Sequence, residues 1–238
     1  MTESANILEF SNVALPGAVR GQAAMRALTF KLPRGCLLLV KVEAGNEYLP
    51  IADAAEGLMA TTTGFIHWHG KAWNSFEPLA ELNIRARIGR VFEKNSWISN
   101  LNVNENVTLC QRHHTESPER DIMTEADALA RYFGLPEVPR QRPAFVSKRE
   151  LKMAEWVRAL IGKPLLLLLE RPETGVPDDD LPKLIDAVQT ALRRGAAVIW
   201  LTDRAVIWNT SIWPNEIRYR MQGMEMILIK DKSHESAV

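Results

Sequence analysis

Three short, uninterrupted apolar runs constrain the fold of this 238-residue chain more than any other feature. They are CLLLV at 36–40, LLLLL at 165–169 and AAVIWL at 196–201. Apolar runs without alternation are typical of parallel strands that are covered by helices on both faces. Between the last two runs, residues 181–192 repeat large apolar side chains at helical spacing, which predicts an amphipathic helix. This strand, helix, strand order predicts an α/β layer with right-handed crossovers.

The N-terminal third and the middle of the chain have different patterns. Residues 7–13, 27–32 and 64–70 alternate partly between apolar and polar, which predicts strands with one face in water. The stretch from about 93 to 157 has no strong strand pattern, and we expect it to be mostly helical. One of its helices is predicted to begin with Thr124 as the N-cap and to end at a glycine.

Composition and charge argue against several classes of function. Lysine plus arginine and aspartate plus glutamate number 29 each, and this neutral balance argues against a nucleic-acid-binding protein. The first ten residues lack the pattern of a signal peptide, and no apolar run approaches a membrane span. Two cysteines, Cys36 and Cys110, fit a reducing compartment. We therefore expect a cytoplasmic protein that reaches a membrane only through a partner.

The stretch VEAGNEYLP, residues 42–50, joins the first buried run to a helix-like segment. A glycine-bearing turn between a strand and a helix is where phosphate-binding loops occur. Such a loop holds phosphate with backbone N–H groups and a lysine, and a serine or threonine hydroxyl ligates Mg²⁺. Residues 42–50 contain no lysine, serine or threonine, and they include two glutamates. The position therefore suggests a phosphate site, whereas the side chains do not.

Four longer stretches connect this loop to a known family. The segment 57–73 is similar to the stretch after a Walker A helix, 88–109 to a Q-loop, 147–176 to a signature helix followed by Walker B and D-loop, and 198–204 to a switch-histidine strand. With these segments, nearly the full length of the chain resembles the ATPase subunit of ABC transporters. Within that family, residues 100–115 are most similar to the Mla-type lipid-trafficking subunits.

The resemblance implies a fold and a set of partners. The fold is a P-loop NTPase of the ABC ATPase type: a RecA-type α/β core with an N-terminal antiparallel β edge and an inserted α-helical subdomain. Residues 1–238 would form one domain, with the core at 1–92 and 158–238 and the helical subdomain at about 93–157. The implied partners are an integral membrane permease subunit and either an active ABC ATPase chain or a second copy. The chain would then lie at the inner face of the membrane.

The residues at the implied Walker A position have lost most of the phosphate-binding groups. Val42 stands at the first glycine, Gly45 is retained, Glu47 replaces the glycine before the lysine, Tyr48 replaces the lysine, and Leu49 replaces the serine or threonine. Removing the lysine removes an ion pair of about 4 kcal/mol at about 4 Å with an effective dielectric near 20. This is roughly a thousandfold in affinity. We expect the loop not to hold ATP tightly.

The implied catalytic positions are altered as well. Glu170 stands at the Walker B aspartate, Arg171 at the catalytic glutamate, Asp203 at the switch histidine, and Glu93 at the Q-loop glutamine. A guanidinium group cannot accept a proton from water. Asp203 would place a negative charge where the γ-phosphate lies in the family. Because these groups act as a unit in phosphoryl transfer, no catalytic residue is assigned.

Two further positions have alternative interpretations. At the implied signature sequence Ser147 is retained, while Lys148 and Arg149 replace the two glycines. The two cations are either surface charge or a grip on the γ-phosphate of a nucleotide bound to a partner. Trp97 and Leu101 come after the Q-loop position, where the family receives a coupling helix of the membrane subunit. They either dock that partner or are buried in the helical subdomain.

The sequence supports three hypotheses of function. The first is a catalytically silent pseudo-ATPase with a structural or regulatory role in a membrane transport complex, for which we expect no cofactor. The second is a functional ATP-hydrolysing ABC subunit with non-standard motifs, in which Glu170 binds Mg²⁺ and ATP is used. The third is an adaptor unrelated to transport. His67 and His69 are interpreted as exposed strand positions, so we predict no metal site.

Overall fold

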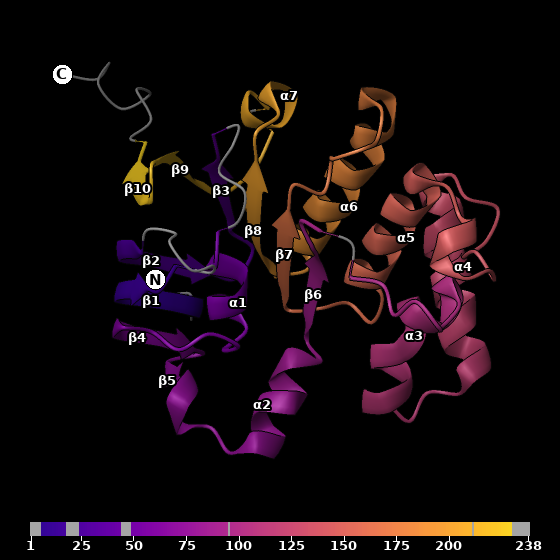
Figure 1. Ribbon diagram of the computed structural model, residues 1–238, viewed down its shortest axis with the longest axis horizontal. Helices are drawn as coiled ribbons and strands as arrows, with labels where there is room; N and C mark the ends of the chain where they lie inside the picture. Colours follow the sequence, from indigo (N-terminus) through magenta and orange to yellow (C-terminus); the bar gives the residue numbers. More distant parts are fainter. Residues whose placement is uncertain (1–5, 18–23, 44–48, 95, 211, 230–238) are drawn as a thin grey trace.

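The computed structural model describes residues 6–17, 24–43, 49–94, 96–210 and 212–229, and it contains two β-sheets (Figure 1). The larger sheet has six strands in the order β10-β9-β3-β8-β7-β6. All neighbouring strands in it are parallel except the pair β9 and β10. The bounds of its strands are β3 Leu37–Lys41, β6 Ile88–Val91, β7 Leu166–Glu170, β8 Ala197–Thr202, β9 Glu216–Gln222 and β10 Glu225–Leu228.

The three apolar runs form the buried centre of this sheet, as predicted, but the prediction of helices on both faces is wrong, because one face is covered largely by strands of the second sheet. Strand β3 shows why its residues need not alternate. Leu37 and Leu39 belong to one hydrophobic cluster, whereas Leu38 and Val40 belong to a second cluster on the other face. Because both faces are covered, every position of the strand has to be apolar.

The smaller sheet is antiparallel and has the strand order β2-β1-β4-β5. Its strands are β1 Asn6–Leu15, β2 Met25–Pro33, β4 Thr63–Trp68 and β5 Lys71–Ala72. Phe10 of β1 and Phe30 of β2 stack with their ring centroids 4.5 Å apart. Both rings belong to the cluster that covers one face of the larger sheet. The predicted antiparallel β edge is thus confirmed.

Helices cover the other face of the larger sheet and extend beyond its β6 edge (Figure 1). The longer ones are α3 Val103–His114, α4 Glu119–Phe133, α5 Lys148–Leu160 and α6 Leu181–Arg193. The short ones are α1 Ile51–Ala55, α2 Pro78–Arg85 and α7 Ala205–Trp208, with 3-10 turns η1 Trp73–Ser75, η2 Pro143–Phe145 and η3 Asp178–Asp180. The buried side chains of the longer helices form one cluster with the face of the sheet that they cover.

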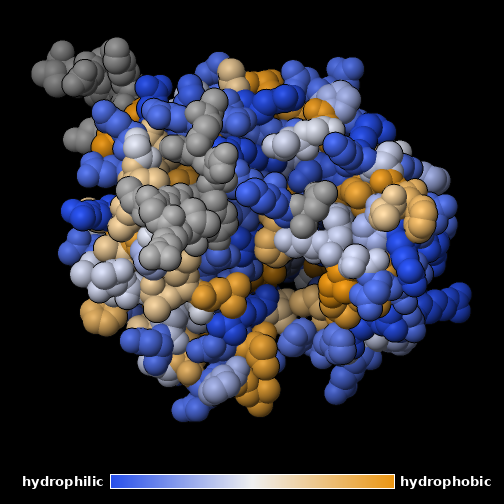
Figure 2. Space-filling view, viewed as in Figure 1, coloured by the Kyte–Doolittle hydropathy of each residue, from blue (hydrophilic) through white to orange (hydrophobic). Residues whose placement is uncertain are grey.

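Helix α5 approaches strand β6 very closely, and a glycine makes this approach possible. A Cβ atom added to Gly89 would lie 1.8 Å from the carbonyl oxygen of Ala159 in α5. Helix α2 is the opposite case, because none of its residues is buried. Its Leu79 and Leu82 are exposed, and Figure 2 shows a strip of hydrophobic surface over this part of the molecule.

The structure also corrects details of the sequence interpretation. Helix α4 begins at Glu119 after Pro118, so Thr124 is not its N-cap. The hydroxyl of Thr124 instead donates to the carbonyl of Arg120 within the helix. Gly134 ends this helix with a φ of 98°, as expected for a left-handed glycine. The strands β5, β9 and β10 were not predicted. Among the described residues, no helix has both the length and the apolar character needed to span a bilayer.

Candidate functional site

The carboxyl ends of β3, β6, β7 and β8 meet at one edge of the larger sheet, where ligands bind in open α/β folds. The residues at the implied catalytic positions all lie there: Glu93 after β6, Glu170 and Arg171 at the end of β7, and Asp203 after β8. Val42 and Leu49, which stand at the two ends of the implied Walker A loop, are buried beside them. Gly45, Glu47 and Tyr48 lie outside the described residues.

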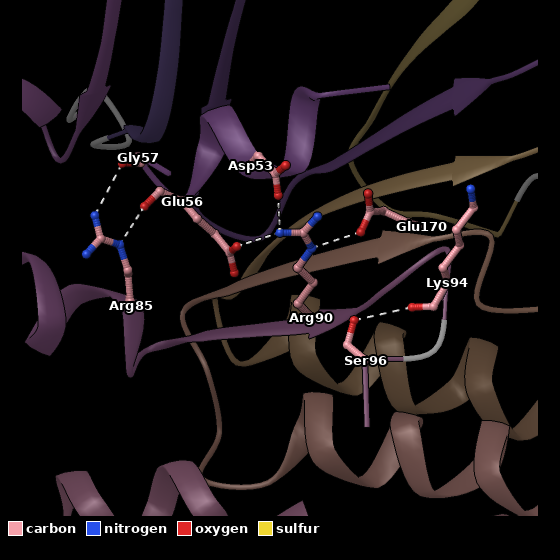
Figure 3. Close-up of polar contacts among 8 residues, drawn as sticks. All are labelled: Asp53, Glu56, Gly57, Arg85, Arg90, Lys94, Ser96 and Glu170. Carbon is pink, nitrogen blue, oxygen red and sulfur yellow. Dashed lines mark hydrogen bonds and ion pairs between the residues drawn. The ribbon is translucent and has the colours of Figure 1, made fainter. Parts of the chain in front are cut away.

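Arg90 of β6 lies at the centre of a buried ion-pair cluster (Figure 3). Its Nε donates to Glu170 at 2.8 Å, and its Nη1 donates to Asp53 and to Glu56 at 2.7 Å each. The side chain of Arg90 is only 5% exposed, so these bonds replace its contact with water. We call Arg90, Asp53, Glu56 and Glu170 the Arg90 cluster. It joins β6 and β7 to α1, the helix that comes after the implied Walker A loop.

Burial dominates the charge states in this cluster. Burial raises the pKa of the carboxyl groups of Glu56 and Glu170, and the attraction of Arg90 only partly opposes this effect. Burial also disfavours the charge on Arg90, but its bonds to the carboxylates outweigh that cost and raise its pKa. Arg90 therefore stays charged and holds Glu170 by a charge-assisted bond. A metal ion at Glu170 would compete with this guanidinium.

Arg171 forms a second group of ion pairs next to the first. Its Nη1 donates to the carboxylate of Glu93, and its Nε lies 3.3 Å from a carboxylate oxygen of Asp203. We call these three residues the Arg171 clasp. Burial raises the pKa of Glu93, and the charge of Arg171 opposes this rise. One guanidinium group thus pairs with two carboxylates at the implied catalytic positions.

The backbone at Arg171 is also unusual. Its φ is 44°, in the left-handed region that residues other than glycine rarely occupy. Its N–H donates to the carbonyl of Leu201 in β8 at 2.9 Å, which ties the end of β7 to the neighbouring strand. Strained backbone of this kind persists where the surrounding structure fixes it. The clasp is therefore a closely defined arrangement and not a loose surface contact.

Little space remains between the two groups. The cavity lined by Val42, Leu49, Glu93, Glu170, Arg171 and Leu201 has a volume of about 10 Å³. A cavity of this size holds about one water molecule. Five carboxyl side chains and two guanidinium groups make up the Arg90 cluster and the Arg171 clasp. The excess of carboxyl groups over guanidinium groups disfavours a polyanion here. Among the described residues, no group of three or more His, Cys, Asp or Glu side chains is arranged to hold a metal ion.

The implied signature residues are used within the chain. Ser147 is the N-cap of α5 and forms a capping box with Glu150, whose carboxylate accepts the Ser147 hydroxyl at 2.6 Å. Arg149 donates twice to Asp180, at 2.8 and 2.7 Å. The grip on a partner's γ-phosphate would require Arg149 to leave this bidentate pair. Lys148 is exposed at the start of the helix.

The loop after β6 carries the two residues predicted to dock a partner. Trp97 is partly buried and packs against the helical cluster, with the guanidinium group of Arg158 4.6 Å from the centre of its ring. Leu101 is also partly buried, whereas Ile98 between them is exposed. Trp97 thus packs against the helical cluster, and Ile98 is the more accessible apolar side chain of the loop. Docking at this loop stays a prediction.

Sequence reasoning missed Arg90 and its partners Asp53 and Glu56. A signal was available, because Arg90 is a single charged residue among the apolar residues of the stretch 88–92. A charge in such a place needs buried partners of opposite sign. The sequence could not say that two of these partners come from the α1 segment, since that contact depends on the packing of the helix against the sheet.

Glu173 is a further buried acid next to the clasp. Its side chain is fully buried and accepts hydrogen bonds from the hydroxyl of Thr202 and from Nε1 of Trp200. Burial raises its pKa, and these hydrogen bonds oppose the rise only in part. The folded state therefore binds the Glu173 proton more tightly than the unfolded state does. The contribution of protonated Glu173 to the stability of the fold is complete below the unfolded-state pKa of about 4.3. It is lost as the pH rises through the pKa of the folded state.

The substitution Glu173→Gln is expected to remove the loss of stability with rising pH, because glutamine does not ionise. The unfolding free energy of the variant, relative to the wild type, should therefore increase as the pH is raised from about 5 to about 8. Urea denaturation of both proteins across this range measures the difference. The exposed Glu225→Gln is the control for removal of a charge. A difference that shrinks with rising pH would contradict the assignment.

Comparison with known proteins gives a consistent picture. No protein-family model matches the chain. The chain is 27% identical over 175 residues to the cell division ATP-binding protein FtsE of Haemophilus influenzae, covering 74% of this chain and 79% of that protein. It is 21% identical over 179 residues to the glutamate transport ATP-binding protein GluA of Corynebacterium glutamicum, covering 75% and 74%. It is 26% identical over 172 residues to the ergothioneine transport ATP-binding protein EgtV of Helicobacter pylori, covering 71% and 78%.

Two solved structures have the same fold. The ATP-binding cassette MJ0796, in a dimeric post-hydrolysis state bound to ADP and Pi, superposes with a TM-score of 0.81 at 17% identity, covering 94% of this chain and 98% of that one. An ATP-binding subunit of an ABC transporter superposes with a TM-score of 0.77 at 18% identity, covering 92% and 88%. The predicted P-loop, ABC ATPase-like fold is confirmed.

Proposed function

We propose that this chain, which has the fold of an ATP-binding cassette and resembles the ATP-binding subunits of ABC transporters, is a nucleotide-binding-type subunit that does not hydrolyse ATP. Its role would be structural or regulatory within a membrane transport complex. The observation that carries the proposal is the Arg171 clasp, in which the positions of the catalytic glutamate, the Q-loop glutamine and the switch histidine form ion pairs with one another.

The chemistry of the site supports a silent role. Hydrolysis needs a group that orients the attacking water, and Arg171 cannot accept its proton. It also needs Mg²⁺, yet the Glu170 carboxylate is bound to Arg90 at 2.8 Å. Each uncompensated carboxylate about 4 Å from a phosphate oxygen would add roughly 4 kcal/mol of repulsion at an effective dielectric near 20. The clasp and the cluster hold more carboxyl groups than guanidinium groups, and this excess opposes both binding and turnover.

The proposal extends to the assembly. The chain would pair with an active ABC ATPase chain or with a second copy, and it would dock on a permease at the inner face of the membrane. The names of its relatives, which include transport ATP-binding proteins, support this arrangement. The likeness to Mla-type lipid-trafficking subunits and the lack of a role in nucleic-acid binding stay predictions.

Calorimetry with ATP and Mg²⁺ tests whether the site binds nucleotide, which hydrolysis requires. We expect no binding heat at ATP concentrations up to about 1 mM, since a loss of about 4 kcal/mol is roughly a thousandfold in affinity. A cassette that binds ATP, measured in the same buffer, is the positive control. A micromolar dissociation constant for this chain would contradict the silent role.

The alternative is a functional ATPase with non-standard residues, and the position of Glu170 favours it. This carboxylate lies at the end of β7, beside the cavity, where a Mg²⁺ ligand is needed. Release of phosphate from ATP that is abolished by Glu170→Ala would support the alternative. The adaptor hypothesis is separated from both by the genes next to the one for this chain, since a transport subunit should have a permease gene nearby.

A further inference from the structure

Three arginines of this chain hold the loop that leads from β6 to α3. We call residues 92–101 the β6–α3 loop; its residue 95 lies outside the described residues. Arg171, at the end of β7, pairs with Glu93. Arg158, in α5, donates through Nη1 to the carbonyl of Ser96 at 2.9 Å and lies 4.6 Å from the ring centre of Trp97. The loop is thus bound from the side of the sheet and from the side of the helices.

Phe92 links the loop to the Arg90 cluster. The guanidinium carbon of Arg90 lies 4.4 Å from the centre of the Phe92 ring, and that of Arg158 lies 5.3 Å from it. An aromatic ring attracts a cation over its face, by up to about 2 kcal/mol where water is excluded. Arg90 in turn is held by Asp53 and Glu56, from α1 and its C-terminal end. The start of the loop therefore depends on contacts that reach across the whole candidate site.

These contacts lie beside the edge of the sheet at which ligands bind in open α/β folds. The loop begins at the carboxyl edge of the sheet, next to the position of a bound phosphate in this type of fold. In this chain the cationic group facing Glu93 is Arg171, which is part of the protein and always present. Breaking a partly buried ion pair leaves an uncompensated charge. The conformation in which Glu93 contacts Arg171 is therefore favoured.

We propose that the Arg171 clasp, together with Arg90 and Arg158, is a built-in device that fixes the β6–α3 loop in one conformation without nucleotide. The surface formed by Ile98 and its neighbours is then preset, and its shape does not respond to ATP. This inference rests on the proposed function, because it assigns to protein side chains the ordering that a bound nucleotide could supply.

Amide hydrogen exchange, read by mass spectrometry on peptides from the loop, tests this inference. Arg171→Gln removes the cation of the clasp, and Glu93→Gln removes the carboxylate on the loop itself. We expect exchange within residues 92–101 to become about tenfold faster in either variant, which corresponds to about 1.4 kcal/mol of local stability. In the wild type, ATP with Mg²⁺ should leave the exchange of this segment unchanged.

Arg112→Gln is the matched control. Arg112 pairs with Glu119 at 3.4 Å on the exposed surface of the helices, away from the loop. Its removal should not alter the exchange of residues 92–101. If Arg171→Gln does not fold, Glu93→Gln decides, because it leaves the contact between Arg171 and Asp203 in place.

Two outcomes would overturn the inference. One is unchanged exchange in a Glu93→Gln variant with native circular dichroism. The other is a wild-type loop whose exchange slows when ATP and Mg²⁺ are added, because a preset loop cannot become more ordered. Failure of the proposed function looks different: ATP would bind in the calorimeter, while the loop would remain protected without it and lose protection in the variants.

Discussion

Replacing Arg90 by methionine is expected to lower the free energy of unfolding by about 3–5 kcal/mol, because it leaves Asp53, Glu56 and Glu170 close together with their cation removed. Glu56 and Glu170 are buried, so water cannot readily replace the lost bonds. Urea denaturation at neutral pH measures the loss. The variant should regain stability in mild acid, since protonation neutralises carboxyl groups whose pKa burial has already raised.

A second substitution separates charge from geometry. Lysine at position 90 keeps the positive charge, but it lacks the planar fork with which arginine donates through Nε and Nη1 to different carboxylates. Arg90→Lys should therefore fall between the wild type and Arg90→Met. The exposed pair Arg112–Glu119 provides the control, because Arg112→Met should cost less than about 1 kcal/mol. If Arg90→Met cost no more than that control, the cluster would not stabilise the fold.

Gly89→Ala is expected to destabilise the protein by more than about 3 kcal/mol or to prevent folding. The added Cβ would lie 1.8 Å from the carbonyl oxygen of Ala159 and 2.8 Å from its carbonyl carbon. Both atoms are backbone of α5, so relief requires the helix to move away from β6. Because α5 packs with α3 and α4, such a movement would disturb the whole helical cluster. Urea denaturation, or loss of soluble protein on expression, measures the effect.

Gly223→Ala is the matched control for this prediction. A Cβ at Gly223 would meet no atom within 4 Å, although its φ of 58° is unfavourable for alanine. The cost should therefore be about 1–2 kcal/mol from the backbone alone. Equal losses in the two variants would show that close packing between β6 and α5 is not what requires glycine at position 89.

The larger sheet could be predicted because its signal is local. Strands β3, β7 and β8 are buried on both faces, and this condition leaves a continuous apolar run in the sequence. Strand β9 was missed for a physical reason. It lies next to β3 towards the edge of the sheet, and its residues 216–222 include exposed and charged side chains that a buried strand would lack. Its place in the sheet comes from pairing with β3, which is a long-range contact.

Part of the arrangement follows from the sequence. The resemblance places Glu93, Arg171 and Asp203 at one site, and the structure brings their side chains into contact. That these residues pair with one another could not be predicted, since it depends on the direction of three side chains that follow three different strands. The same holds for Arg149, whose partner Asp180 lies 31 residues away in sequence. Once a fold is known, opposite charges at positions that it brings together nevertheless predict such ion pairs.

The mutual dependence within the Arg171 clasp limits how this site can change. A carboxylate in place of Arg171 would face Glu93 and Asp203 with no cation between the three acids. Histidine in place of Asp203, or glutamine in place of Glu93, would each leave Arg171 with one fewer counter-ion. Replacing Arg171 alone by an acid is therefore the least favourable of these changes, because it leaves three acids together, whereas either of the other two leaves one acid paired with Arg171. If the chain has the proposed silent role, directed evolution of ATPase activity should recover variants in which codon 171 changes together with codon 93 or codon 203.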